Sequence, residues 1–474
     1  MRSSISRLKL GGAVAVSGLA MLLLAGCTVG PKYSRPQVAA TPAFRGADNA
    51  AISSDSKESV GDENWAAVFR EPELQSLIRA ALANNPDLRV AAQRVLEQQA
   101  QVRITRAQQF PTLSVGGTGI GAELPNNLGF NISSPISDGS FNLSAAWTPD
   151  FWGQYRKQTE AARAQLLSLT WAQRAVRLSL VQQVATSYLT LRALDRQLEI
   201  ARQTLEVREH SVDLTRTLER GGSVPLSDLR QAEQLLYTAS SQIPQLEQQI
   251  QQQENAMRLL LGESPGPVAH TDPNALIPPP QDLPTGLPSQ LLERRPDIEE
   301  AEQQLVAANA QIGVARAQFF PQLMLSASGG VGGDSFGNLF DPASRTIYGL
   351  GSLAQPLFEG GKLKGQLQLA EATKQEMVVS YQRAIKTALH DVSNALIAVK
   401  KQRASREQQE KLVEAAKDAT RLARLRYNGG ATSYLEVLTT DSDLFSAQLN
   451  LAGAQENEAL TLVQLYSALG GGWQ

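Results

Sequence analysis

The side chains that usually carry out chemistry are few in this chain and far apart. Its 474 residues include three histidines, His210, His270 and His390, and a single cysteine, Cys27. Zinc sites and nucleophilic centres need such side chains in clusters, for example two histidines four residues apart on one helix. None of these four residues has a partner at that spacing, and one cysteine cannot form a disulfide within the chain. The sequence therefore predicts no catalytic residue and no metal site.

Charge and glycine patterns exclude two further classes of function. Lysine and arginine number 44 against 46 aspartate and glutamate, so the basic excess of a general nucleic-acid binder is missing. Two glycine-rich runs, 116–119 and 329–333, open onto polar loops rather than onto a helix N-terminus. Phosphate loops need the latter arrangement. We expect neither a nucleic-acid partner nor a nucleotide cofactor.

Cys27 follows a segment that resembles a bacterial lipoprotein signal. Three basic residues precede the apolar stretch Leu10–Ala25, which is too short for a stable transmembrane helix. The stretch ends in Leu-Ala-Gly before the cysteine, so the resemblance implies cleavage after residue 26 and a lipid on Cys27. By family convention the non-acidic Thr28 permits export to the outer membrane. An ordinary secretory signal that happens to end near a cysteine is the alternative.

The remaining sequence contains an internal duplication. Residues 85–119 align with 295–329 at an offset of 210, including Pro-Asp starts and Phe-Pro ends. Later matches pair 149–153 with 356–360 and Arg220-Gly-Gly with Asn428-Gly-Gly. Each half therefore predicts the same order: a helix, two extended segments, a very long helix, a Gly-Gly turn and a shorter helix.

Four helices are clear from the sequence. Residues 153–219 and 361–427 lack proline and repeat apolar residues at heptad-like spacing, which predicts helices approaching ~100 Å at 1.5 Å per residue. Their companions, 86–109 and 226–261, are shorter. Such lengths cannot be buried in one globular core, so we expect the helices to lie side by side. Pro244 lies inside one of them and should bend it, because an interior proline removes one backbone hydrogen bond.

The extended segments have the period of two that is typical of strands. Apolar residues alternate with polar ones over 141–147 and 323–328, and 111–120 and 345–357 are compatible with the same pattern. Strands of about ten residues can cross a bilayer. Four strands in an open sheet would leave unpaired edges in lipid, so copies of the chain must close a barrel. A dimer would give eight strands and a trimer twelve. The number of strands alone does not decide between these two oligomeric states.

Several runs closely resemble the TolC-like outer membrane efflux family, and more narrowly the lipoprotein outer-membrane channels of resistance-nodulation-division (RND) efflux pumps. They are Leu283–Ile298, Ala315–Pro321, Pro356–Lys362 and Leu465–Trp473. The resemblance implies a mainly α fold with transmembrane β structure. In that fold a trimeric 12-stranded β-barrel continues into a 12-helix periplasmic α-barrel, and each chain contributes two repeats.

The resemblance also implies a division of the chain. A lipoprotein signal peptide (1–26) precedes an N-terminal anchor and equatorial segment (27–84). Repeat 1 (85–261) contains a β-hairpin at 111–151, and repeat 2 (296–469) contains one at 321–358. A Pro-rich equatorial linker (262–295) separates the repeats, and 470–474 forms a C-terminal tail.

Function follows from the same resemblance. The chain would be the outer-membrane exit duct of a tripartite pump, anchored by lipid on Cys27, extending into the periplasm and passively conducting small molecules such as drugs. Its expected partners are two further copies, a periplasmic adaptor (membrane fusion) protein and an inner-membrane RND transporter. The duct of a type I protein secretion system is the closest alternative. A periplasmic coiled-coil scaffold would explain the helices and the lipid but not the strands.

The candidate site residues lie at the two Gly-Gly turns, which the family uses to meet its adaptor. These turns contain Gly221, Gly222, Gly429 and Gly430. Asp228 and Glu436 occupy the positions of the family's acidic gate residues, and Tyr427 that of a gate tyrosine. In a trimer each acid becomes a ring of three carboxylates, which favours cations.

Two positions depart from the family pattern around this gate. Thr432 stands where some relatives have arginine, and Thr439 where many have a second aspartate. Asp441 and Asp443 are nearby acids that could compensate. The alternative to a gate is that the acids are simply solvated at a helix tip.

Overall fold

The computed structural model describes residues 28–37, 44–45, 59–122, 136–269, 290–333 and 337–473. The signal segment 1–26, Cys27, His270 and most of the Pro-rich linker lie outside these residues. The chain divides into two units. The first comprises residues 1–37, 95–169 and 301–381, and the second comprises 38–94, 170–300 and 382–474.

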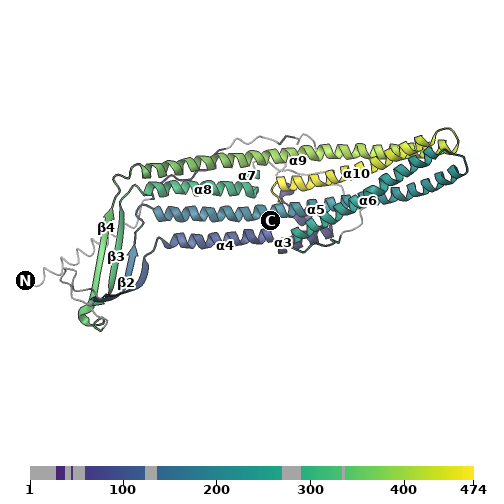
Figure 1. The fold of residues 1–474 in the computed structure, drawn as a ribbon. Coiled ribbons are helices and arrows are strands. Elements are labelled where there is room, and N and C mark those ends of the chain that lie inside the picture. The colour runs from purple at the N-terminus through teal and green to yellow at the C-terminus, as the bar shows by residue number, and fades with distance from the viewer. Residues whose placement is uncertain are drawn as a thin grey trace, which may run out of the picture. The chain divides into compact units, whose positions relative to one another are not determined.

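A four-stranded antiparallel sheet lies in the first unit (Figure 1). Its strands, in spatial and chain order, are β1 (Thr112–Ala122), β2 (Ile136–Trp147), β3 (Gln322–Gly333) and β4 (Arg345–Ala354), and the short helix η3 (Pro342–Ser344) precedes β4. The four predicted strands are confirmed. β2 and β3 extend further than the apolar alternation indicated, because their glycine and serine rows also pair. The β2–β3 pairing joins the two repeats directly.

The two faces of this sheet differ in chemistry. The register places Leu143 opposite Val115 of β1 and Gly329 of β3, so one face is apolar. The other face holds hydroxyl pairs, with Ser114 Oγ 2.7 Å from Ser144 Oγ. An apolar face opposite a polar face is the pattern of a strand between lipid and a wet lumen.

Four helices enter the first unit, and their ends follow the sequence signals closely. They are α4 (Pro86–Ala107), α5 (Gln154–Arg220), α8 (Pro296–Ala317) and α9 (Lys362–Asn428). α4 and α8 each begin at a proline, whose missing N–H costs nothing in the first turn. Both end before a Phe-Pro pair, as predicted. α5 and α9 have 67 residues each and continue into the second unit.

The second unit contains the main hydrophobic core. α6 (Leu226–Leu261) and α10 (Tyr434–Ala468) pair with the far parts of α5 and α9 as two helical hairpins (Figure 1). Short elements pack on this core: η1 (Val60–Asp62), α2 (Trp65–Val68), α3 (Pro72–Asn84) and α7 (Leu291–Arg294). Buried Ile78 of α3, Tyr188 of α5 and Val392 of α9 belong to the same cluster.

α3 was not predicted as a helix, and α6 contains the proline that was expected to bend it. Pro72 at the first turn and the apolar spacing Leu74, Ile78, Ala81 could have revealed α3. α6 is continuous through Pro244. The bend itself stays a prediction.

Candidate functional site

The two hairpin turns have the same backbone geometry. Gly222 and Gly430 both adopt φ of 70°, in the left-handed region. In the first turn, the N–H of Gly222 donates to the carbonyl of Glu219 and that of Ser223 to Leu218. Gly430 and Ala431 make the equivalent bonds to Tyr427 and Arg426. This is a Schellman motif, which satisfies the last carbonyls of a helix, and glycine takes the left-handed position without a Cβ penalty.

Asp228 and Glu436 occupy equivalent places after these turns. Each is the third residue of its helix, and its N–H donates to the residue before that helix, Pro225 at 3.1 Å and Ser433 at 3.2 Å. A carboxylate in the first turn is stabilised by the helix dipole. This placement is compatible both with a gate and with simple helix-end acids.

The surroundings of the two acids differ. Arg426 Nη1 donates to Glu436 Oε1 at 2.7 Å, and the Thr432 hydroxyl donates to Oε2. Thr432, which departs from the family arginine, therefore binds the carboxylate of Glu436 itself. The equivalent positions of the first hairpin hold Leu218 and Val224, which can provide neither interaction. Asp228 instead accepts from its neighbour Ser227 at 3.2 Å. The carboxylate of Glu436 has a cationic partner within its own hairpin, whereas Asp228 is in contact with a neutral serine hydroxyl.

Tyr427 lies between the two hairpins. Its ring centroid is 5.1 Å from that of Tyr434, whose hydroxyl is 2.6 Å from Ser211 Oγ on α5. Burial, and then the proximity of Tyr434 and Asp228, raise the pKa of Tyr427. Tyr434 belongs to a small apolar cluster from all four helices, and Tyr427 packs against it. The buried members of the cluster are Val212, Leu229, Ala232, Ala423, Tyr434, Val437 and Leu438.

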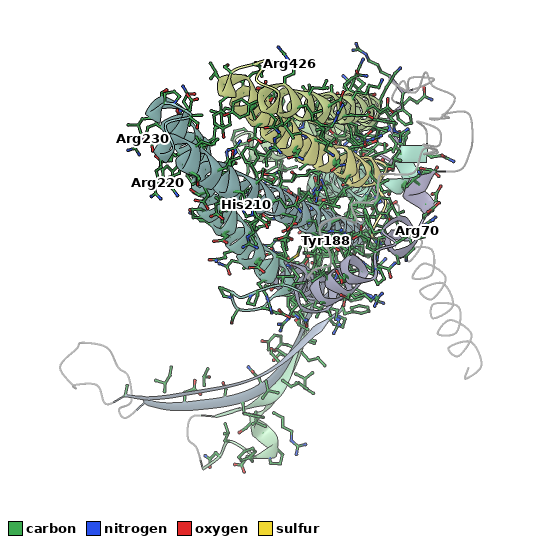
Figure 2. All side chains as sticks on the ribbon, turned by 90° about the vertical axis from the view of Figure 1, so that its right-hand side faces the viewer. Arg70, Tyr188, His210, Arg220, Arg230 and Arg426 are labelled. Atoms are coloured by element: carbon green, nitrogen blue, oxygen red, sulfur yellow. The ribbon has the colours of Figure 1, made fainter. Side chains whose placement is uncertain are left out.

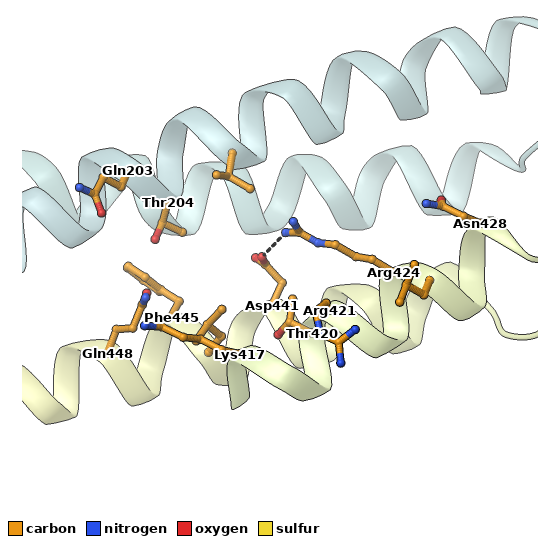
Figure 3. Close-up of a pocket in the computed structure, with 13 residues that line it drawn as sticks. Gln203, Thr204, Lys417, Thr420, Arg421, Arg424, Asn428, Asp441, Phe445 and Gln448 are labelled. Carbon is orange, nitrogen blue, oxygen red and sulfur yellow. Dashed lines mark hydrogen bonds and ion pairs between the residues drawn. The ribbon is translucent and has the colours of Figure 1, made fainter. Parts of the chain in front are cut away.

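A buried arginine clamps the two hairpins together. Arg208 on α5 is only 4% exposed, and its Nε lies 3.0 Å from Asp441 Oδ2 on α10. Its Nη1 also donates to the carbonyl of Leu235 on α6 at 2.7 Å. Arg424 of α9 reaches the other oxygen of Asp441 at 3.2 Å (Figure 3). One side chain thus joins three helices, and sequence analysis missed it because nothing in the pattern of α5 distinguishes Arg208.

The clamp occurs once although the chain is duplicated. The offset at the turns is 208 residues, so Asp441 corresponds to Glu233 and Arg424 to Arg216. Arg216 Nη2 lies 3.6 Å from Glu233 Oε1, which reproduces the Arg424–Asp441 contact. Arg208, however, corresponds to Ala416. The buried cation is therefore specific to the first repeat.

A groove of about 650 Å³ lies beside the clamp, lined by α5, α9 and α10 (Figure 3). Its walls include Lys417, Arg421 and Arg424 as well as apolar Phe445. Figure 2 looks onto the hairpin ends, where Arg220 and Arg230 project from the first hairpin and Arg426 from the second. Most of these cations have acidic neighbours, since Arg230 pairs with Glu233 and Arg421 with Asp418.

Thr439 and Asp443, which were also considered as parts of the gate, have surroundings that are common on helices. The Thr439 hydroxyl donates to the carbonyl of Leu435 one turn earlier, at 2.9 Å. Asp443 is exposed. Of the two acids that could compensate for Thr439, Asp441 is the one that is partly buried and ion-paired.

Within the described ranges no group of three or more histidine, cysteine or carboxylate side chains could hold a metal ion. Every helix in the described part of the chain is too short or too polar to cross a membrane.

Comparison with known proteins decides the family. The profile described as "Outer membrane efflux protein" matches residues 77–263 and 287–471, one match for each repeat. This chain belongs to the outer membrane efflux protein family.

Members with names and structures are similar along nearly the whole chain. TtgC of Pseudomonas putida, a probable efflux pump outer membrane protein, is 36% identical over 463 residues, which cover 95% of this chain and 94% of TtgC. The cation efflux system protein CusC of Escherichia coli is 34% identical over 455 residues, covering 96% and 97%. A crystal structure of CusC, described for transmembrane channel formation, superposes with a TM-score of 0.84 at 32% identity and covers 94% of this chain and 100% of that chain.

These likenesses confirm the predicted fold class and function. The chain has the α-barrel and β-barrel fold of the outer membrane efflux channels, and it is an outer-membrane efflux protein. The roles of Cys27, Asp228, Glu436, Tyr427 and the turn glycines stay predictions. Cys27 lies outside the described residues.

Proposed function

We propose that three copies of this chain form the exit channel of a tripartite efflux pump. The channel passively conducts small molecules such as drugs, received from an adaptor and an inner-membrane transporter, across the periplasm and the outer membrane. The chain is a conduit and not an enzyme. The observation that carries the proposal is the incomplete sheet at one end of very long helices.

The sheet supports a closed assembly because neither of its edges pairs with another strand among the described residues. β1 and β4 are the outer strands, with 11 and 10 residues. Ile347 on β4 is 90% exposed and Leu113 on β1 is 73% exposed. Pairing β4 of one copy with β1 of the next removes the edges, as a membrane requires. Three copies give twelve strands and leave room for a lumen, whereas eight strands leave an interior that side chains fill.

The hairpin turns support the partner assignment. A 67-residue helix extends ~100 Å, enough to carry the turns far from the membrane. The turns at Gly221, Gly222, Gly429 and Gly430 then meet a periplasmic adaptor, through which an inner-membrane RND transporter delivers cargo. Lipid on Cys27 adds a second attachment to the outer membrane.

We further propose that Asp228 and Glu436, with Tyr427, form the periplasmic gate. The carboxylate of Asp228 should contribute more to the electrostatic potential of the gate, because Glu436 already has Arg426 and Thr432 as partners. In the trimer, rings of these carboxylates select for cations at the constriction.

Purified full-length protein tests the assembly. We expect a trimer that resists sodium dodecyl sulfate until heated, and discrete conductance steps in planar bilayers. A dimer would overturn the twelve-stranded arrangement. A trimer without conductance would favour a scaffold. A co-purifying adaptor with an RND transporter supports the pump, whereas one with a protein-exporting ATPase would favour the secretion duct.

A further inference from the structure

Residues 28–35 form an extended strap along α8 in the first unit. The N–H of Val29 donates to the carbonyl of Trp152 at 3.1 Å, and Asn309 Nδ2 of α8 donates to the carbonyl of Pro31 at 3.1 Å. Thr28 contacts Gly153, at the point where β2 returns to α5. The strap therefore runs towards the junction of strands and helices.

Two glycines set the closest approach of the strap to α8. A Cβ on Gly30 would lie 2.7 Å from Gly313 Cα, and one on Gly313 would lie 2.9 Å from the carbonyl oxygen of Val29. Gly30 also has φ of 136°, where other residues are strained. Backbone touches backbone here, which fixes the position of the strap along the helix.

The other end of the strap is held by a buried carboxylate. Glu302 of α8 is 8% exposed, and its oxygens lie 2.5 Å from Arg35 Nη2 and 2.9 Å from the Tyr33 hydroxyl. Arg35 Nε also donates to the hydroxyl of Tyr381 on α9 at 3.1 Å. Burial, and then the bond to Glu302, raise the pKa of Tyr33. Tyr33, Arg35, Glu302 and Tyr381 are called the strap lock below.

The strap has no slack between these two fixed points. Arg35 to Gly30 is five residues, or about 17 Å of extended chain at ~3.3 Å per residue. Glu302 to Gly313 is eleven residues of helix, also about 17 Å at 1.5 Å per residue. Because the two lengths match, an added or lost residue shifts the register between the strap and α8 and strains one of the two contacts.

We propose that the strap and its lock act as a ruler that holds the lipid-bearing N-terminus at the strand–helix junction. Thr28, the residue after Cys27, lies at the level where the strands begin, which is the level of the membrane surface for a barrel of these strands. The ruler keeps the acyl chains beside the periplasmic end of the barrel during insertion. This inference rests on the proposed lipidation of Cys27.

Two variants test the ruler, with the same dipeptide inserted before the strap lock in one and after it in the other. Gly-Ser inserted after Lys32 adds about 7 Å of slack between the lock and Cys27. Gly-Ser inserted after Gln37 lies beyond the lock and leaves the measured segment unchanged. Both variants and wild type are expressed with radiolabelled palmitate, and heat-resistant trimers in the outer membrane are quantified. We expect label in all three, wild-type trimer yield for the Gln37 insertion, and at least a fivefold loss for the Lys32 insertion.

Charge exchange at the lock provides an independent check. Arg35→Glu should lower trimer yield, and Arg35→Glu combined with Glu302→Arg should restore it, whereas Lys32→Gln on the exposed side of the strap should have no effect. If both insertions assemble like wild type while carrying label, the ruler is wrong and the lipid anchor stands. If wild type takes up no palmitate, the lipidation proposal fails and the ruler fails with it.

Discussion

At the scale of single residues, the hairpin ends combine acids that sequence patterns reveal with partners that they do not. Asp228 and Glu436 can be found from the repeat, because each follows a Gly-Gly turn at the same distance. Their different environments come from Leu218 and Val224 in one hairpin and Arg426 and Thr432 in the other. Only the folded hairpin shows which neighbours reach the carboxylate.

Replacing Asp228 and Glu436 should change the ion preference of the channel if they form the proposed gate. We expect Asp228→Ala to lower the cation-to-anion permeability ratio in bilayer recordings more than Glu436→Ala does, because Glu436 is already ion-paired. The double variant should have the lowest ratio and a raised resting conductance. Asp443→Ala is the matched control at an exposed acid of the same helix. An unchanged ratio in the double variant would show that these acids do not line the constriction.

Removing the clamp should weaken the packing between the two hairpins. Arg208→Leu leaves Asp441 partly buried with Arg424 as its remaining cation, and breaking a buried ion pair typically costs about 3 to 5 kcal/mol. We expect a lower thermal unfolding temperature and frequent spontaneous openings. Arg421→Ala, which removes an exposed pair with Asp418, should cost under about 1 kcal/mol. Equal effects of the two changes would argue against the clamp.

At the scale of elements, local signals set most of the helix and strand limits. Prolines mark the starts of α4 and α8, and α5 and α9 begin and end within about a residue of the predicted limits. The clamp could not be predicted, since Arg208 and Asp441 are brought together by the packing of two hairpins that are distant in sequence. The β2–β3 register is likewise a long-range property, because no turn connects these strands.

The turn glycines offer a sharp test of the tip geometry. Gly430→Ala places a Cβ in the left-handed region, at a cost of about 1 to 2 kcal/mol. Gly429→Ala, one residue earlier and without a positive φ, should be neutral or slightly stabilising. Proteolysis at the hairpin end should therefore be faster in the first variant than in the second. Equal cleavage rates would contradict the Schellman turn.

At the scale of the whole molecule, the sheet predicts which surface meets lipid. Phe141 and Asn142 are neighbours in the middle of β2 and lie on opposite faces. Phe141→Lys should cost about 2 to 4 kcal/mol, as a charge on a lipid-facing strand does near the bilayer centre, and should reduce folded trimer in the outer membrane. Asn142→Lys should assemble normally and shift permeability towards anions. A reversed result would mean that the two faces have been assigned the wrong way round.

Because only the first repeat carries Arg208, the contacts between neighbouring hairpins would be unequal around the proposed trimer. In the proposed trimer six hairpins would alternate around the ring, and every contact between hairpins of one chain would carry the buried guanidinium that ties α5 to α10. Each contact between chains would need the same cation from position 416 of α9, where the residue is alanine. Opening of the channel at the hairpin ends should therefore begin at the three boundaries between protomers. The two hairpins of each chain should then move outward together as one rigid body.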